Sequence, residues 1–330
     1  MKNMLLFYTS LNFLLIFICA KISYKLKFLD NPNKRKIHKV PIAYTGGVAL
    51  SIGYLFALEM FDVADKDLNL ILSIGFLITF VGLIDDKYQL NIGGKLSLQI
   101  IPIFYLIVVE NIKITSLGNY NYFILELGYF SVPFTLLCVL FLLNAFNYFD
   151  GVDGSLSFCV ISSISILYFL TNKNEVNLFI LLILIPLCLF LLFNFKLFNL
   201  PKLFLGDNGS LLFGFIISFL LIYFANKQIV HPILCAWSIS IFVFEFIAIN
   251  LIRIKKKSKL FKAAQDHLHH ILLKKNNSIF LTNTIMVFLN IFLFSIGYLS
   301  YKLIGPDVSL VLFIISFMVY LFFRYKFNQT

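Results

Sequence analysis

Eleven apolar runs follow one another along this chain of 330 residues, and together they leave little room for a soluble fold. Each run is near the length of a helix that crosses hydrocarbon, which is roughly 17–25 residues. The chain is 60% hydrophobic, against roughly 45–50% apolar residues in an average soluble domain. The sequence therefore predicts an all-α polytopic membrane protein with about 11 transmembrane helices and one domain over residues 1–330. The runs cover residues 4–20, 46–61, 68–84, 96–109, 132–146, 155–170, 176–193, 210–225, 229–251, 280–301 and 306–323.

The first run differs from a secretory signal peptide, since a single lysine, Lys2, precedes it and a basic cluster follows it. It is therefore expected to stay as the first helix. All five cysteines fall inside apolar runs, where a thiol acts as a small hydrophobe, and they indicate no disulfide framework or cysteine metal site.

The basic residues predict the orientation of the helices. With eleven spans, the loops at 21–43, 85–95, 144–154, 194–209 and 252–279 share one side with the C-terminus. That side holds 21 of the 27 Lys and Arg residues. The positive-inside rule places it in the cytoplasm and the N-terminus outside. The net charge of +11 is then explained by this asymmetry and by the attraction of basic loops to anionic lipid headgroups. It requires no nucleic-acid partner.

Two adjacent carboxylates, Asp85 and Asp86, close the third run in the sequence VGLIDDKYQL. A helix C-terminus disfavours negative charge, so something must offset the cost. One interpretation is a solvated helix end neutralised by Lys87. The other is a binding site, with Lys95 at the start of the next run as a cation that meets a phosphate.

A second polar stretch, NAFNYFDGVDGSL, lies between two apolar runs. If a helix extends to about Phe149, Asn144, Asn147 and Asp150 lie on one face of it. The stretch contains no Lys or Arg to neutralise Asp150 and Asp153. Carboxylates at a membrane boundary indicate a functional site, although a polar loop is the simpler alternative.

The third motif is the sequence FLGDNGS, with Phe204 and Asp207. It is compatible with a plain turn in which Ser210 is the N-cap of the next helix. The functional alternative is that a helix N-terminus attracts anions and that Asp207 holds Mg²⁺, which proteins bind through one or two carboxylates plus substrate phosphates. Phe204 would offer a ring on which a base stacks.

The sequence QDHLHH carries the fourth motif, the histidines His267, His269 and His270. A solvated basic loop against lipid is the simpler interpretation. A zinc site lacks further His or Cys nearby, so imidazoles beside a phosphate suit the carboxylates elsewhere better. The set has carboxylates for a metal and cations for phosphate, which indicates phosphoryl transfer at the membrane surface. The glycine pair Gly46 and Gly47 predicts close packing of the second span.

The ordered motifs DD, NxxNxxDGxDG, GDxGS and HxHH resemble the polyprenyl-phosphate N-acetylhexosamine-1-phosphate transferases, from about His38 to His270. The resemblance implies that a cytoplasmic UDP-sugar and undecaprenyl phosphate give a lipid-linked sugar and UMP. It also implies Mg²⁺, with Mn²⁺ as an alternative ion, and an enzyme in the bacterial inner membrane that starts a cell-surface glycan. A homodimer is left open.

Carried over by position, the resemblance implies that Asp85, Asp86 and Asp207 are catalytic, with Asp207 and Asp86 as metal ligands. It gives the substrate-binding residues as Lys95 for phosphate, Asn144, Asn147, Asp150 and Asp153 on the nucleoside side, Phe204 for uracil, and His267, His269 and His270 for the diphosphate or sugar. The chain departs from the family pattern at Tyr44, Glu245 and Asp266, which bears on the sugar contacts.

The HxHH pattern favours a simple UDP-N-acetylhexosamine, such as UDP-GlcNAc or a deoxy relative, as donor. Glu245 favours the alternative, a phospho-MurNAc-pentapeptide transferase. A secondary transporter is the rival class, since intramembrane carboxylates also mark transport pathways. The polar motifs, however, gather at one interface and show no inverted repeat. A structural scaffold would leave the acidic motifs unexplained.

Overall fold

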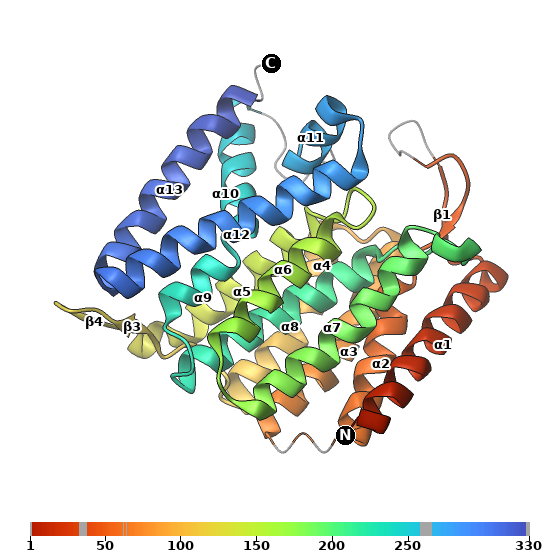
Figure 1. The fold of residues 1–330 in the computed structure, drawn as a ribbon, viewed down its shortest axis with the longest axis horizontal. Helices are drawn as coiled ribbons and strands as arrows, with labels where there is room; N and C mark the ends of the chain where they lie inside the picture. The colour runs from red at the N-terminus through yellow and green to blue at the C-terminus, as the bar shows by residue number, and fades with distance from the viewer. Residues whose placement is uncertain (1, 33–37, 62, 64, 258–265, 328–330) are drawn as a thin grey trace.

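A computed structural model describes residues 2–32, 38–61, 63, 65–257 and 266–327, and these residues are mostly helical (Figure 1). The α-helices in this part of the chain are α1 (Lys2–Leu26), α2 (Gly46–Met60), α3 (Lys66–Tyr88), α4 (Ile92–Phe104), α5 (Ser131–Asn147), α6 (Ser155–Leu170), α7 (Asn174–Asn194), α8 (Gly206–Asn226), α9 (Pro232–Ser238), α10 (Ser240–Lys255), α11 (Leu268–Asn276), α12 (Ile279–Leu303) and α13 (Pro306–Phe327). The strands are short and form two antiparallel pairs, β1 (Leu29–Asp30) with β2 (Ile42–Ala43) and β3 (Ser116–Asn119) with β4 (Ile124–Glu126).

Ten of the eleven apolar runs fall on one helical segment each, and the run 229–251 falls on two helices, α9 and α10. Within the described residues, eight helical segments are long and apolar enough to cross a membrane, counting α4 together with the π-helical turn Tyr105–Val109 that follows it. Helices α9 and α10 make a ninth candidate as a pair bent by 70°. Helices α2 and α6 are apolar but only 15 and 16 residues long. The chain is therefore a multi-pass membrane protein with eight or nine candidate spans, and the count of eleven stays a prediction.

The loops fall into two polar groups at opposite ends of the helices. At one end, Lys66 pairs with Glu110, the His231 ring contacts the Asn119 carbonyl, and the backbone N–H of Asn121 donates to Asp307. The four sequence motifs meet at the other end. Figure 1 shows β3 and β4 on the first side and α11 and β1 on the other. The predicted topology, with the loops of the motif end in the cytoplasm, stays a prediction.

Helix α8 lies at the centre of the bundle, and its candidate span is 94% buried. Glycines let its N-terminal end approach two other helices. A Cβ at Gly82 of α3 would lie 2.4 Å from Asn208 Cα, and one at Gly47 of α2 would lie 2.3 Å from Gly209 N. The close packing predicted for the glycine pair is confirmed at Gly47. Because Gly82 has no side chain, α3 can pack directly against the N-terminal end of α8. This close packing brings Asp85 and Asp86 next to Asp207.

Candidate active site

Lys95 joins two of the motifs through its ammonium group. Its Nζ lies 2.5 Å from Asp85 Oδ2 and 2.6 Å from Asp207 Oδ2. The three residues come from the end of α3, the first turn of α4 and the first turn of α8. Lys95 therefore offsets the unfavourable free energy of the negative Asp85 side chain at the C-terminus of α3. The alternative of a solvated helix end neutralised by Lys87 is wrong, because Asp85 is buried and Lys87 Nζ lies over the Phe28 and Tyr88 rings.

Asp86 caps the N-terminus of α8. Its Oδ1 accepts the backbone N–H of Asp207 at 3.1 Å, and its Oδ2 accepts the backbone N–H and the side-chain amide of Asn208 at 3.2 and 2.7 Å. The first N–H groups of a helix lack partners within the helix and carry the positive end of its dipole. Asp86 thus supplies the partners that α8 lacks. Both of its oxygens are used in this way, and its role as a metal ligand stays a prediction.

Asn147 holds Asp207 from the other side. Its Nδ2 donates to Asp207 Oδ1 and to Ser210 Oγ, both at 2.9 Å. Ser210 is not the N-cap of α8, as the simpler interpretation of the third motif had it. The helix begins at Gly206, because Asp86 already caps it, and Ser210 lies inside. Asn144 is not brought to this cluster, since its Nδ2 donates to the Leu140 carbonyl of its own helix.

Asp153 has a cationic partner that its own segment lacks. Lys202 Nζ lies 2.5 Å from Asp153 Oδ2 and 5.5 Å from the centre of the Phe204 ring. The expectation of an unneutralised Asp153 is therefore wrong, since the partner comes from the segment before α8. The edge of His38 meets the same ring, with the centroids 5.3 Å apart. Phe204 itself is fixed by its N–H, which donates to the Ala43 carbonyl at 2.7 Å.

Asp150 lies in the turn between α5 and α6 with no basic partner among the described residues. Its pKa is raised to about 8, first because burial penalises the charged form and then because Asp207 and Asp153 are negative. The backbone N–H of Gly206 opposes this shift. Burial therefore favours the neutral form of Asp150, and a cation beside it would favour the ionised form.

The histidine loop, meaning His267 and the first turn of α11 as far as His270, lies against this turn. A Cβ added at Gly151 would be 2.5 Å from His269 Nε2 and 2.7 Å from His270 Nε2. Burial lowers the pKa of His267 and His269, and it lowers the pKa of His270 to about 4. The imidazoles are therefore neutral at pH 7. His267 Nδ1 and His269 Nε2 are buried and have no hydrogen-bond partner among the described residues, so both atoms have unused hydrogen-bonding capacity.

The carboxylates are of the kind that a magnesium ion shares with phosphate groups. Within the described residues no group of three or more His, Cys, Asp or Glu side chains is arranged to hold a metal. Two carboxylate oxygens, however, converge on one cation, Lys95 Nζ, from Asp85 and Asp207. Mg²⁺ commonly takes one or two carboxylates and fills its other positions with water and phosphate oxygens. Asp207 and Asp85 are thus the pair best placed to hold it.

Several polar residues at the site escaped sequence analysis. Asn208 ties three segments together, because its amide donates to the Tyr44 carbonyl and to Asp86 while its Oδ1 accepts the Val48 N–H. Lys202 and His38 flank Phe204, as described above. Asn208 stands within the motif FLGDNGS, but Tyr44, Val48 and Asp86 lie far from it in sequence. Only the fold identifies those contacts.

The sequence matches glycosyl transferase family 4 over residues 68–225. The chain is 27% identical to the undecaprenyl-phosphate alpha-N-acetylglucosaminyl 1-phosphate transferase of Yersinia pestis, over 92% of this chain and 86% of that protein. It is 26% identical to the protein of the same name in Escherichia coli K12, over 93% and 86%. It is 29% identical to a probable undecaprenyl-phosphate N-acetylglucosaminyl 1-phosphate transferase of Bacillus subtilis, over 92% and 84%.

The matched range runs from α3 to α8 and contains Asp85, Asp86, Lys95, Asn147 and Asp207. It therefore includes the side chains that meet at the N-terminus of α8. The alignments with the transferases extend over most of the remaining chain. The chain thus matches the glycosyl transferase family 4 model over the part that holds these side chains, and it is similar over most of its length to the named transferases.

Proposed function

We propose that the protein transfers a sugar 1-phosphate from a UDP-sugar to undecaprenyl phosphate and releases UMP. The observation that carries this proposal is the convergence of Asp85, Lys95 and Asn147 on Asp207 at the N-terminus of α8. A helix N-terminus with a lysine and acid side chains suits phosphate groups and their counter-ion. The relatives carry names that describe an N-acetylglucosaminyl 1-phosphate transferase acting on undecaprenyl phosphate.

The acceptor phosphate is the nucleophile in this proposal. One of its oxygens attacks the β-phosphorus of the UDP-sugar, the bond between that phosphorus and the bridging oxygen breaks, and UMP leaves. Such displacements depend mainly on positioning and on neutralisation of charge. A phosphate monoester is largely dianionic at pH 7, since its second pKa is near 6. A general base is therefore a minor requirement, and Asp85 is assigned to orienting Lys95, with which it pairs, and to holding the metal.

A bound Mg²⁺ would supply charge neutralisation at the diphosphate, with Asp207 and Asp85 as the residues that hold it. Asn147 keeps the Asp207 carboxylate in place through Oδ1, and Asp86 fixes the backbone beneath it. Asp150 and Asp153 are assigned to the nucleoside side, with Phe204 as the ring on which uracil stacks. The histidine loop is assigned to the diphosphate or the sugar, because His267 Nδ1 and His269 Nε2 are buried without a partner among the described residues.

The active site is assigned to the cytoplasmic face of the bacterial inner membrane, with the N-terminus outside and eleven spans. The support is the excess of Lys and Arg on the loops of the motif end and the grouping of these loops at one end of the bundle. Under this assignment α2 and α6 also span. A homodimer and a single domain over the whole chain stay predictions.

A simple UDP-N-acetylhexosamine is the proposed donor, and UDP-GlcNAc the first candidate. The pattern His267-Leu268-His269-His270 supports it. Glu245, which favours the MurNAc-pentapeptide alternative, is not remote from this pattern, because its Oε1 accepts the Leu268 N–H at 2.8 Å. The two features therefore belong to one structural unit, and the donor assignment rests on experiment.

The test is UMP release by purified protein in nanodiscs, with a panel of UDP-sugars, undecaprenyl phosphate and Mg²⁺. We expect UMP only when acceptor and metal are both present, and the fastest release from a simple UDP-N-acetylhexosamine. The matched control is Asp207→Asn, which keeps the shape of the side chain and removes its charge. UMP release without acceptor would overturn the transfer reaction, and preference for UDP-MurNAc-pentapeptide would overturn the donor.

A further inference from the structure

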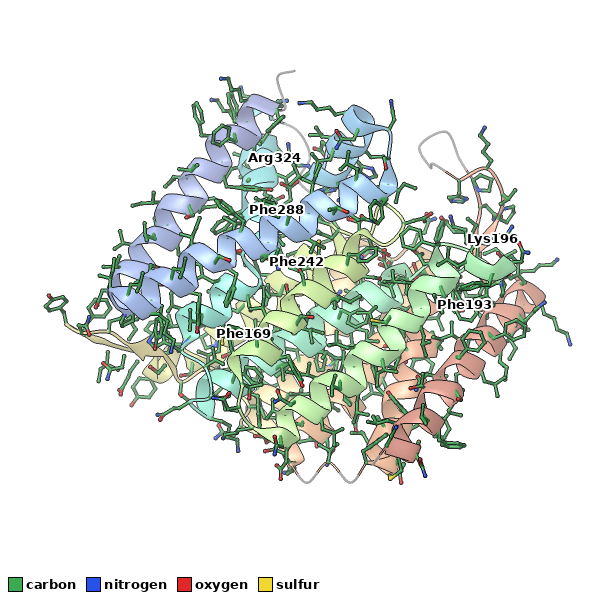
Figure 2. The ribbon with its side chains drawn as sticks, viewed as in Figure 1. Phe169, Phe193, Lys196, Phe242, Phe288 and Arg324 are labelled. Carbon is green, nitrogen blue, oxygen red and sulfur yellow. The ribbon has the colours of Figure 1, made fainter. Side chains whose placement is uncertain are left out.

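We infer that the ion pair between Glu245 and Arg324 positions the histidine loop, so that α13 supports the binding of the donor. This inference rests on the proposed function for the identity of the donor. The contacts that carry it involve α10, α13 and the segment before α11. Figure 2 labels Arg324 toward the end of α13 that lies near α10 and α11.

The ion pair is enclosed in the protein. Arg324 Nε lies 2.8 Å from Glu245 Oε2 and Arg324 Nη2 lies 3.0 Å from Glu245 Oε1. Both side chains are 1% exposed. Tyr320, one turn earlier on α13, donates its hydroxyl to Glu245 Oε2 at 2.7 Å. The guanidinium therefore meets the carboxylate in a two-point geometry that restricts the orientation of both groups.

The same pair binds the backbone on each side of His267. Glu245 Oε1 accepts the N–H of Leu268 at 2.8 Å. Arg324 Nη2 donates to the carbonyl of Asp266. These two groups belong to the peptides that flank His267, which is itself the N-cap of α11. Both peptides are thus held by one ion pair, and the Cα of His267 has little freedom to move.

A second ion pair holds the loop at its start. Arg253 of α10 donates to both Asp266 oxygens, at 2.7 Å from Nη2 and 3.1 Å from Nε. The Tyr148 ring lies 4.7 Å from the His267 ring and 5.5 Å from the Arg253 guanidinium, centre to centre. The histidine loop is therefore connected to α10, α13 and the turn after α5.

Stability alone is a poor explanation for this arrangement. Apolar side chains of similar volume usually stabilise a fold as well as a buried ion pair does, and charged side chains near a membrane are costly and commonly functional. On α13 the fully buried residues are Ser309 and Arg324, both polar. Ser309 accepts the Trp237 N–H and joins α13 to α9. Arg324 instead reaches the loop whose imidazoles face Gly151.

A position fixed in this way suits the chemistry of the loop. His267 Nδ1 and His269 Nε2 lack partners among the described residues, and a ligand must find them already oriented to gain their full interaction. Binding groups need support to within about 0.5 Å. The ion pair supplies this support to the donor side of the site only. Loss of the ion pair should therefore weaken binding of the UDP-sugar donor and leave binding of the acceptor unchanged.

Two variants test this role. Arg324→Lys keeps the charge and loses the two-point contact, and Tyr320→Phe removes one hydroxyl from Glu245. We expect each to raise KM for the UDP-sugar, by about tenfold for Arg324→Lys and less for Tyr320→Phe, as a hydrogen bond to a charged group predicts. KM for undecaprenyl phosphate should stay unchanged. Lys326→Gln is the control, because it removes an exposed charge from the same helix.

Hydrogen exchange supplies a readout that is independent of activity. Amides of the peptide spanning Leu268–Asn276 should exchange faster in both variants, while those of the first turn of α8 should not change. If Arg324→Lys does not fold, Tyr320→Phe carries the test. Unchanged exchange in this peptide, or an equal rise of both KM values, would overturn the inference. A wild-type protein that releases no UMP would instead refute the proposed function, and the exchange experiment would still decide the positioning role.

Discussion

Asn208 donates two hydrogen bonds to Asp86, one from its backbone N–H at 3.2 Å and one from its side-chain amide at 2.7 Å. This contact joins the last turns of α3 to the first turn of α8. It explains how two adjacent aspartates at a helix C-terminus are tolerated, since the positive end of α8 faces one and Lys95 pairs with the other. The two residues of the DD motif therefore have different partners and should respond differently to substitution.

The first prediction separates Asp86 from Asp207. Asp207→Asn should reduce turnover by a few powers of ten and raise the Mg²⁺ concentration needed for half-maximal rate, because the charge that attracts the ion is lost. Asp86→Asn should lower Tm by several degrees, because an amide has one acceptor oxygen where three N–H groups now donate.

Differential scanning fluorimetry measures the effect on Tm, and a Mg²⁺ titration of UMP release measures the effect on turnover. An Asp86→Asn protein with wild-type Tm and a raised Mg²⁺ requirement would instead identify Asp86 as a metal ligand.

The second prediction concerns the lysine between two carboxylates. Lys95→Met removes the ammonium that now lies between Asp85 and Asp207. Their negative charges should then attract a divalent cation more strongly. We expect Mn²⁺ to bind about tenfold more tightly without substrate, equivalent to roughly 1.4 kcal/mol, while turnover falls because the phosphate loses its cation.

Titration of free Mn²⁺ by electron paramagnetic resonance measures this affinity. Lys87→Met is the matched control, since Lys87 lies over the rings of Phe28 and Tyr88 and should leave Mn²⁺ affinity unchanged. Equal affinity in Lys95→Met and wild type would show that the ion binds away from these two carboxylates.

The sequence was sufficient to predict the helical membrane fold and the family, because long apolar runs and four ordered motifs are local signals. It also predicted that loops far apart would share one side. The partners of the charged residues could not be predicted in the same way. Asp153 pairs with Lys202, which is 49 residues away, and this contact follows from how the segment before α8 lies beside the turn after α5.

Helix boundaries set a second limit on what the sequence could predict. Ser210 has the residue type of an N-cap, yet α8 begins at Gly206, because its N–H groups are capped by a carboxylate from α3. Asn144 has the spacing of a site residue, yet its amide bonds within α5. For Ser210 a tertiary contact overrides the local preference, whereas Asn144 is held by a bond within its own helix. The role of α13 was also hidden, since Arg324 resembles a basic residue at a helix end.

The third prediction concerns topology. Phe198 lies before α8 at the motif end and Tyr122 lies between β3 and β4 at the other end, and their side chains are 86% and 90% exposed. In a cysteine-free background, Tyr122→Cys should react with an impermeant maleimide in intact cells, and Phe198→Cys should react only after permeabilisation. An exposed position is needed at the motif end, because residues of the motifs themselves, such as Asn208, are fully buried. Reaction of Phe198→Cys in intact cells would place the motif end outside.

The fourth prediction concerns pH and stability. The pKa of Asp150 is raised from 3.8 to about 8, mainly by burial, so between these pH values the folded protein binds a proton that the unfolded chain releases. Its contribution to stability is therefore present at low pH and is lost as pH rises toward 8. Asp150→Asn keeps a neutral side chain at every pH. Its Tm relative to wild type should increase from pH 5 to pH 8 and then stay level.

Thermal unfolding in detergent without Mg²⁺ or substrate measures the difference. Glu59→Gln, which removes an exposed carboxylate from α2, is the control for net charge. A difference that is constant from pH 5 to pH 9 would mean that Asp150 is ionised in the folded protein throughout, and another cation would have to be found beside it.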